Sequence, residues 1–148
     1  MLADTLKMLF NRDLNQLKVE IGLYQNENDI WKIQEGITNS AGTLCLHLVG
    51  NLNTYIGAEF GKTGYVRNRA LEFSMKDIPR TALVSKIEET IVVVNNALNN
   101  ISEEELKMEF PILVFENKTS TEFMLIHLTT HLAYHLGQIS YHRRLLQS

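Results

Sequence analysis

Apolar residues recur at helical spacing along most of the chain, and this periodicity limits the possible folds more than any other feature. The N-terminal stretch 2–25 repeats every three or four residues, at Leu6, Phe10, Leu14, Leu17, Ile21 and Tyr24. Such spacing places the apolar side chains on one face of a helix. Three further long segments have helical character, and the only β-like runs, 92–94 and 112–115, are short. The sequence therefore predicts an all-α four-helix bundle.

Capping residues and helix breakers indicate where the later helices begin and end. Asn39 or Ser40 can cap a second helix, which we expect to run to about Phe60 before Gly61. A third helix is predicted to start near Pro79 and to end at residues 99–100. The last helix is predicted over 120–146, after a capping box formed by Thr119 and Glu122.

Three segments between these helices are expected to be irregular. Long loops are predicted at 62–78 and 102–118, after the second and third helices. Residues 30–39 are also expected to be irregular, with Trp31 and Ile33 packed against the bundle as a plug. No linker, repeat or low-complexity tract divides the chain, so a single domain over 1–148 is predicted.

Composition excludes several classes of function. The 148 residues are 45% hydrophobic and 21% charged, and the net charge is −3, so a large basic surface for nucleic acid is not expected. No apolar run approaches the roughly 20 residues that a membrane-spanning helix needs. Polar residues interrupt the N-terminus too early for a signal peptide, and the only cysteine is Cys45. These features favour a cytoplasmic location, without nucleic-acid or membrane partners.

Four of the five histidines lie in one stretch of sixteen residues, 127–142, within the last predicted helix. His127, His131 and His135 are spaced by four, and such a pair can present two imidazoles to one metal ion. The row is about 12 Å long at 1.5 Å per residue, so all three should not bind the same ion. The pairs 127/131 and 131/135 both remain possible, whereas His142 lies about 10 Å beyond His135.

A further ligand would have to come from another helix, and His47 is the only histidine outside this segment. Three nitrogen ligands leave coordination positions open, which is typical of catalytic rather than structural zinc sites. Histidines that are simply hydrogen-bonded in the core are the alternative interpretation. Cys45 should point away from the site, because it is about 200° around the helix from His47.

The motifs around these histidines resemble those of the DinB/YfiT-like superfamily of metal-binding four-helix bundles. The similar segments are H-L-A-Y-H-L-G-Q-I at 131–139, L-H-L-V-G-N at 46–51 and G-Y-V-R at 64–67. The resemblance implies one divalent ion, zinc or nickel, bound by His47, His131 and His135. His127 then becomes a flanking residue. Leu136 stands where members of the superfamily often have arginine.

Catalytic groups other than the metal site are not evident in the sequence. Leu132 follows His131, so the glutamate of the zinc-peptidase motif H-E-x-x-H is missing. His127, Gln138 and Tyr134 are the candidates for residues that support the site. Gly137 is expected to allow close approach of another helix.

The resemblance also implies a reaction class. Related branches transfer low-molecular-weight thiols such as bacillithiol or mycothiol, so a metal-dependent thiol transferase acting on a small electrophile is expected. Arg67 and Arg69 could bind a carboxylate of the substrate, or they could lie in a solvated loop. The alternative is a non-enzymatic stress-response bundle, in which the ion is structural or acts as a sensor.

The last helix is apolar on two faces, and this predicts a homodimer. One face would fill the core of the bundle. The second, which carries Leu132 and Leu136, would be covered by the 62–78 loop, by a neighbouring helix or by another copy of the chain.

Overall fold

The computed structural model describes residues 1–147, and its regular elements are all helices. Its long helices are α1 (Leu2–Leu23), α2 (Ala41–Leu52), α4 (Arg80–Asn99) and α6 (Thr121–Leu146). The short elements are the 3-10 helix η1 (Glu27–Trp31), the π-helix η2 (Asn53–Ala58), α3 (Arg69–Ser74) and α5 (Glu103–Lys107). The predicted all-α fold is confirmed. Over the described residues, β pairing is limited to one isolated bridge between Glu109 and Ser120.

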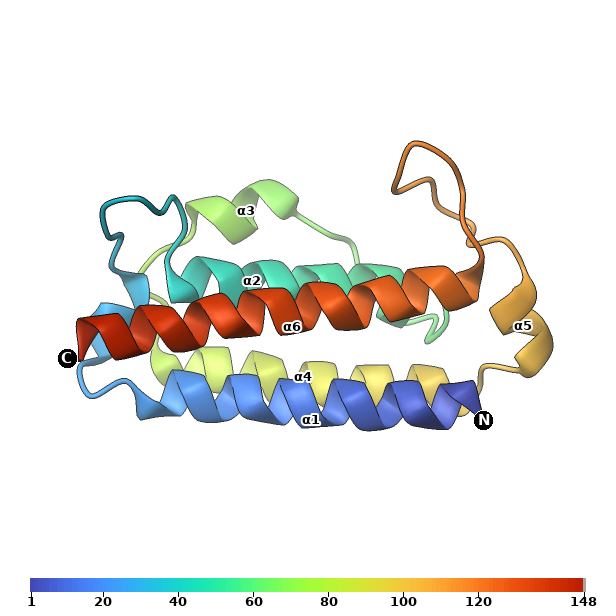
Figure 1. The fold of residues 1–148 in the computed structure, drawn as a ribbon, viewed down its shortest axis with the longest axis horizontal. Helices are drawn as coiled ribbons and strands as arrows, with labels where there is room; N and C mark the ends of the chain where they lie inside the picture. The colour runs from blue at the N-terminus through green and yellow to red at the C-terminus, as the bar shows by residue number, and fades with distance from the viewer. Residues whose placement is uncertain (148) are drawn as a thin grey trace.

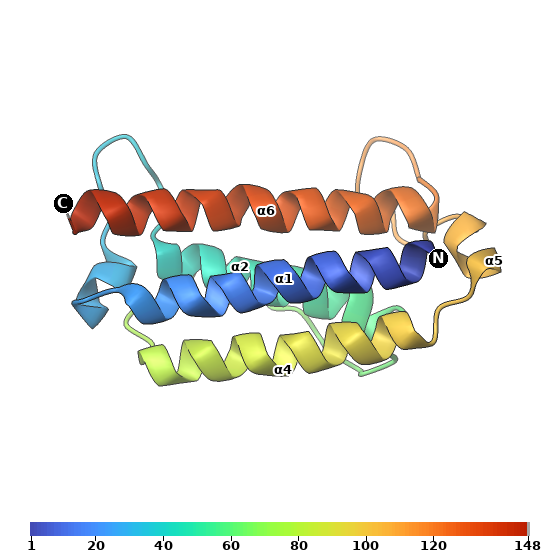
Figure 2. The ribbon, with the colours of Figure 1, turned by 60° about the horizontal axis from the view of Figure 1, so that its bottom comes forward.

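The four long helices pack in two layers (Figure 1). Helices α1 and α4 form one layer, and α2 and α6 form the other, with α6 also against α1 and α2 against α4. Figure 2 shows α6 and α1 running in the same direction, opposite to α4. In chain order, α1 runs up, α2 and α4 run down, and α6 runs up again. A long crossover must join α2 to α4, and α3 lies within it, beside α2 on the outside of the bundle.

Each long helix buries one apolar stripe in a common core. The predicted stripe of α1 is fully buried, and so is a face of α6 made of Leu125, Leu128, Leu132 and Ile139. Each buried leucine stabilises the fold by about 1.5–3 kcal/mol relative to exposure. Leu132 therefore packs inside its own chain, with Leu136 against the same core. This removes the reason for a dimer through that face, and a homodimer stays a prediction without an assigned interface.

The helix starts differ from the predicted ones by about one residue. Of the two possible caps for α2, Ser40 takes the role, and its side chain accepts a hydrogen bond from the Thr43 amide. The prediction of Thr119 as the cap of α6 is wrong, because Ser120 accepts from the Phe123 amide instead. The hydroxyl must stand three residues before the amide that it accepts from, and adjacent hydroxyl residues make this register ambiguous in the sequence.

Both predicted loops contain a short helix that the sequence analysis missed. Ser102 and Glu105 form a reciprocal capping box that starts α5. Asn68 caps α3 by accepting a hydrogen bond from the Leu71 amide. The expected helix 39–60 also changes character at Asn53, where a π-helix replaces the α-helix.

The expected plug at 30–39 is half right. Trp31 packs against the core beside Gly42, where an added Cβ would lie 2.6 Å from the indole ring. Ile33, in contrast, is 52% exposed and takes no part in the plug. None of the helices described is both long and apolar enough to span a membrane.

Candidate metal centre

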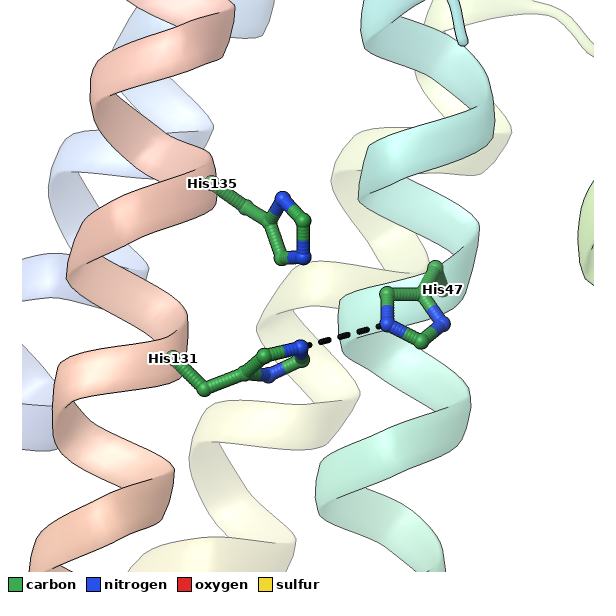
Figure 3. Close-up of side chains that lie close together, drawn as sticks. All are labelled: His47, His131 and His135. Carbon is green, nitrogen blue, oxygen red and sulfur yellow. Dashed lines mark hydrogen bonds between the residues drawn. The ribbon is translucent and has the colours of Figure 1, made fainter. Parts of the chain in front are cut away.

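His47, His131 and His135 meet between α2 and α6. Each residue offers one nitrogen, and the three nitrogens lie within 4.8 Å of one another. Figure 3 shows His47 projecting from α2 toward the two rings that α6 presents. The Nε2 atoms of His47 and His131 are 3.3 Å apart. The i,i+4 spacing on α6 thus places two imidazoles side by side, and the facing helix supplies the third.

A buried carboxylate orients His47. The Nδ1–H of His47 donates to Oε1 of Glu72 over 3.2 Å, which leaves its Nε2 directed toward His131. Arg67 holds the same carboxylate with two hydrogen bonds, of 2.8 Å to Oε2 and 3.0 Å to Oε1. A carboxylate that fixes the tautomer and the ring orientation is the common support for a metal-binding histidine. Sequence analysis missed Glu72 because it lies in the crossover, 25 residues after His47.

A glycine on α2 makes the room that Glu72 needs. A Cβ at Gly50 would lie 1.9 Å from Oε2 of Glu72, so any other residue would displace the carboxylate. Gly50 is three residues after His47, on the same side of the helix. The spacing H-x-x-G was therefore the one local signal that another chain segment approaches closely here.

Gln138 supports His135 in a similar way. The Nδ1–H of His135 donates to Oε1 of Gln138 over 2.7 Å, within α6 itself. His131 differs, because its buried Nδ1 has no hydrogen-bond partner among residues 1–147. Two of the three imidazoles are therefore oriented by side-chain acceptors, and the third is held by packing.

The surroundings of the histidines favour their neutral forms. Desolvation, together with the charges of the neighbouring histidines and of Arg67, lowers the pKa of His131 to about 4. Burial also lowers the pKa of His47, although its hydrogen bond to Glu72 acts in the opposite direction. Neutral imidazoles carry the free lone pairs that a metal ion requires. The rings of His47 and His131 are therefore available as ligands at neutral pH.

The remaining predicted neighbours lie at the edge of the site or outside it. His127 packs edge-on against Phe115, with 4.7 Å between the ring centroids, and its ring stacks beside His131 at 6.2 Å. Tyr134 is 65% exposed, and its ring lies 5.4 Å from that of His135. Cys45 is fully buried, and desolvation raises its pKa to about 12, so it remains a thiol.

Two hollows flank the three histidines. The larger one, about 570 Å³, is lined mainly by the segment 34–39 and by α6 residues that include His135 and Gln138. The smaller one, about 360 Å³, is lined by His47, Asn51, Tyr55, Arg67, Arg69 and His131, among others. Both volumes fall in the range of about 300–1,000 Å³ that is usual for small-molecule sites. A ligand could therefore reach the histidines from either side.

The donor set fits a divalent transition metal. Imidazole suits zinc and nickel, and three neutral ligands leave coordination positions for a small molecule. Among residues 1–147, these three histidines form the one cluster of three or more potential metal ligands, and no carboxylate belongs to it. His142 lies elsewhere, and both of its ring nitrogens are hydrogen-bonded: Nδ1 accepts from the Tyr24 hydroxyl and Nε2–H donates to the Lys32 carbonyl.

The family comparison covers nearly the whole chain. Residues 3–148 match a family model described as a protein of unknown function, DUF1572, and the chain belongs to this family. No curated protein matches the sequence.

Proposed function

We propose that this DUF1572 protein is a DinB-like, metal-dependent enzyme that binds one divalent ion through His47, His131 and His135. The observation that supports the proposal most directly is the convergence of three imidazole nitrogens within 4.8 Å. Three further residues orient His47: Glu72 accepts its hydrogen bond, Arg67 holds Glu72 in place, and Gly50 leaves room for the carboxylate.

The reaction class that we propose is transfer of a low-molecular-weight thiol to a small electrophile. A bound zinc or nickel ion would act as a Lewis acid and would lower the pKa of a thiol or a water molecule. The chain would contribute position: Glu72 holds His47, Gln138 holds His135, and the two hollows give access to the histidines. A thiol suits this site, because an already acidic nucleophile has less need of a general base.

The distribution of carboxylates supports this choice over peptide hydrolysis. No acidic side chain lines the smaller hollow, and Glu35 is the acidic side chain that lines the larger one. Glu72 is the carboxylate closest to the rings in the hydrogen-bond network, but both of its oxygens are held by Arg67 and His47. A metallopeptidase needs a free carboxylate as general base beside the metal.

Metal content measured on the purified protein tests the binding step. We expect about one zinc or nickel ion per chain, lost when His47, His131 and His135 are all replaced by alanine. His142→Ala is the matched control, because it removes a histidine of the same helix and should retain the ion. Full metal occupancy in the triple variant would contradict the site.

Turnover is tested separately, with a panel of thiols and electrophiles and with the metal-free protein as the reference. Metal-dependent conjugation would support the transferase. If the ion binds but no pair reacts faster than without protein, the alternative of a structural or sensory ion is favoured.

A further inference from the structure

The smaller hollow carries an arginine with no ionic partner. Arg69, at the first turn of α3, makes no hydrogen bond or salt bridge to any residue in the range 1–147, and its guanidinium lies 5.5 Å from the centre of the Phe73 ring. Arg67 contrasts with it, because its charge is neutralised by the two hydrogen bonds to Glu72. Of the two guanidinium groups that line this hollow, only that of Arg69 is free to bind a ligand.

The lining of the hollow leaves this positive charge uncompensated. The side chains around it are histidine, asparagine, tyrosine, arginine and apolar residues, with no aspartate or glutamate among them. A guanidinium without a carboxylate partner, in a concave site, favours an anionic ligand. Its planar pair of N–H donors matches the two oxygens of a carboxylate.

A second side chain in the same hollow lacks a partner. Asn51 is only 8% exposed, and its Oδ1 makes no hydrogen bond within the described chain. Leaving a buried amide oxygen unpaired is unfavourable, and a ligand with a donor group would satisfy it. Asn51 lies one turn after His47 on α2, so it connects the histidines to the hollow.

We propose that this hollow is the binding site for a small thiol that also carries a carboxylate. The carboxylate pairs with Arg69, and the rest of the molecule lies along Asn51 toward His47 and His131. This inference rests on the proposed function for the thiol, whereas the anion site depends on Arg69 alone. The thiol substrate is therefore expected to carry a carboxylate rather than to be a neutral molecule.

Calorimetry with matched pairs of probes tests the inference. The zinc-loaded protein is titrated with mercaptoacetate and 3-mercaptopropionate, each compared with its neutral amide. We expect at least one acid to bind about tenfold or more tightly than its amide, as a charge-assisted hydrogen bond predicts. Arg69→Gln should abolish this preference. Arg144→Gln is the control, because Arg144 also stacks on an aromatic ring, at 4.4 Å from Tyr141, but lies outside the hollow.

The metal-free protein separates this inference from the proposed function. Propionate is compared with propionamide there, and a preference for propionate that Arg69→Gln removes supports the anion site even if zinc fails to bind. Equal binding of acids and amides to the zinc-loaded protein would overturn the inference and leave metal binding intact. A preference that survives Arg69→Gln would also overturn it.

Discussion

Helix α6 carries two kinds of histidine, and the contrast between them explains how this fold separates structure from chemistry. His142, near the C-terminal end, is buried and saturated: its Nδ1 accepts a hydrogen bond from the Tyr24 hydroxyl over 2.6 Å, and its Nε2–H donates to the Lys32 carbonyl over 2.8 Å. It ties α6 to the end of α1 and to the segment after η1. No lone pair is left for a metal ion.

His131 and His135, two to three turns earlier on the helix, have no such saturation. Gln138 accepts a hydrogen bond from one nitrogen of His135, and the Nδ1 of His131 has no hydrogen-bond partner in the described part of the chain. Their remaining nitrogens face His47, where three potential lone pairs share one small volume. The same residue type on the same helix is thus a structural crosslink at one end and a candidate ligand in the middle. The difference lies in the partners that the neighbouring segments supply.

The largest effect is expected on zinc affinity, when the residues that orient His47 are replaced. Glu72→Gln should weaken zinc binding by about 10- to 100-fold, because outer carboxylates that orient a ligand histidine have effects of this size. Gly50→Ala should have a similar effect, since its Cβ would lie 1.9 Å from Oε2 of Glu72 and would push the carboxylate away from His47. Competition with a chromogenic chelator measures both affinities.

Gly137→Ala is the control for the glycine substitution. Nothing lies within 4 Å of a Cβ at Gly137, so the expectation that this glycine allows close helix approach is wrong. Alanine at this helical position should stabilise the fold by about 0.5–1 kcal/mol and leave zinc affinity unchanged. An unchanged affinity in both Glu72→Gln and Gly50→Ala would show that the carboxylate does not act on the metal centre.

A smaller effect is expected in the pH dependence of the metal-free protein. His131 has a pKa of about 4 in the folded state, against the ordinary histidine value of 6.5. The unfolded chain therefore binds the proton first as the pH falls, and the free energy of unfolding should decrease between pH 6.5 and about 4. The upper bound is about 1.4 kcal/mol per pKa unit. Urea unfolding with a chelator present measures this slope.

His131→Asn isolates the contribution of this histidine, because the other titrating groups remain. The variant should show a flatter dependence over the same pH window. The shifts of His47 and His127 have the same direction, so part of the slope should persist. An identical slope in the variant and the parent protein would contradict the assignment.

The sequence was sufficient for the four long helices and for two alternative histidine pairs on α6, because both depend on local spacing; the choice of His131 and His135, with His47, came from the family resemblance. Apolar residues three and four apart predicted the buried stripe of α1, and the i,i+4 rows on α6 limited the ligand pairs to two. Periodicity could not show which apolar face of α6 meets the core. The choice of the face with Leu132 depends on the partners α1 and α2, and so the argument for a dimer through that face was wrong.

The support around the site could not be predicted, because it depends on contacts distant in sequence. Glu72 reaches His47 only because the crossover returns over α2, and nothing in the local sequence distinguishes it from other solvated glutamates. The same holds for the pairing of Arg67 with Glu72, which leaves Arg69 as the free arginine. Gly50 was a readable signal in principle, since a glycine inside a helix costs about 1 kcal/mol relative to alanine.

The last prediction concerns the saturated histidine. Tyr24→Phe removes the hydroxyl that His142 accepts from and leaves a buried ring nitrogen unpaired, which should cost about 1–3 kcal/mol of unfolding free energy. Tyr141→Phe is the control, because Tyr141 is 64% exposed and should change stability by less than about 0.5 kcal/mol. Chemical denaturation measures stability, and chelator competition measures zinc affinity in the same variants. The contrast between the two kinds of histidine requires that Tyr24→Phe lowers stability and leaves zinc affinity unchanged; a loss of zinc affinity would mean that the two regions are coupled along α6.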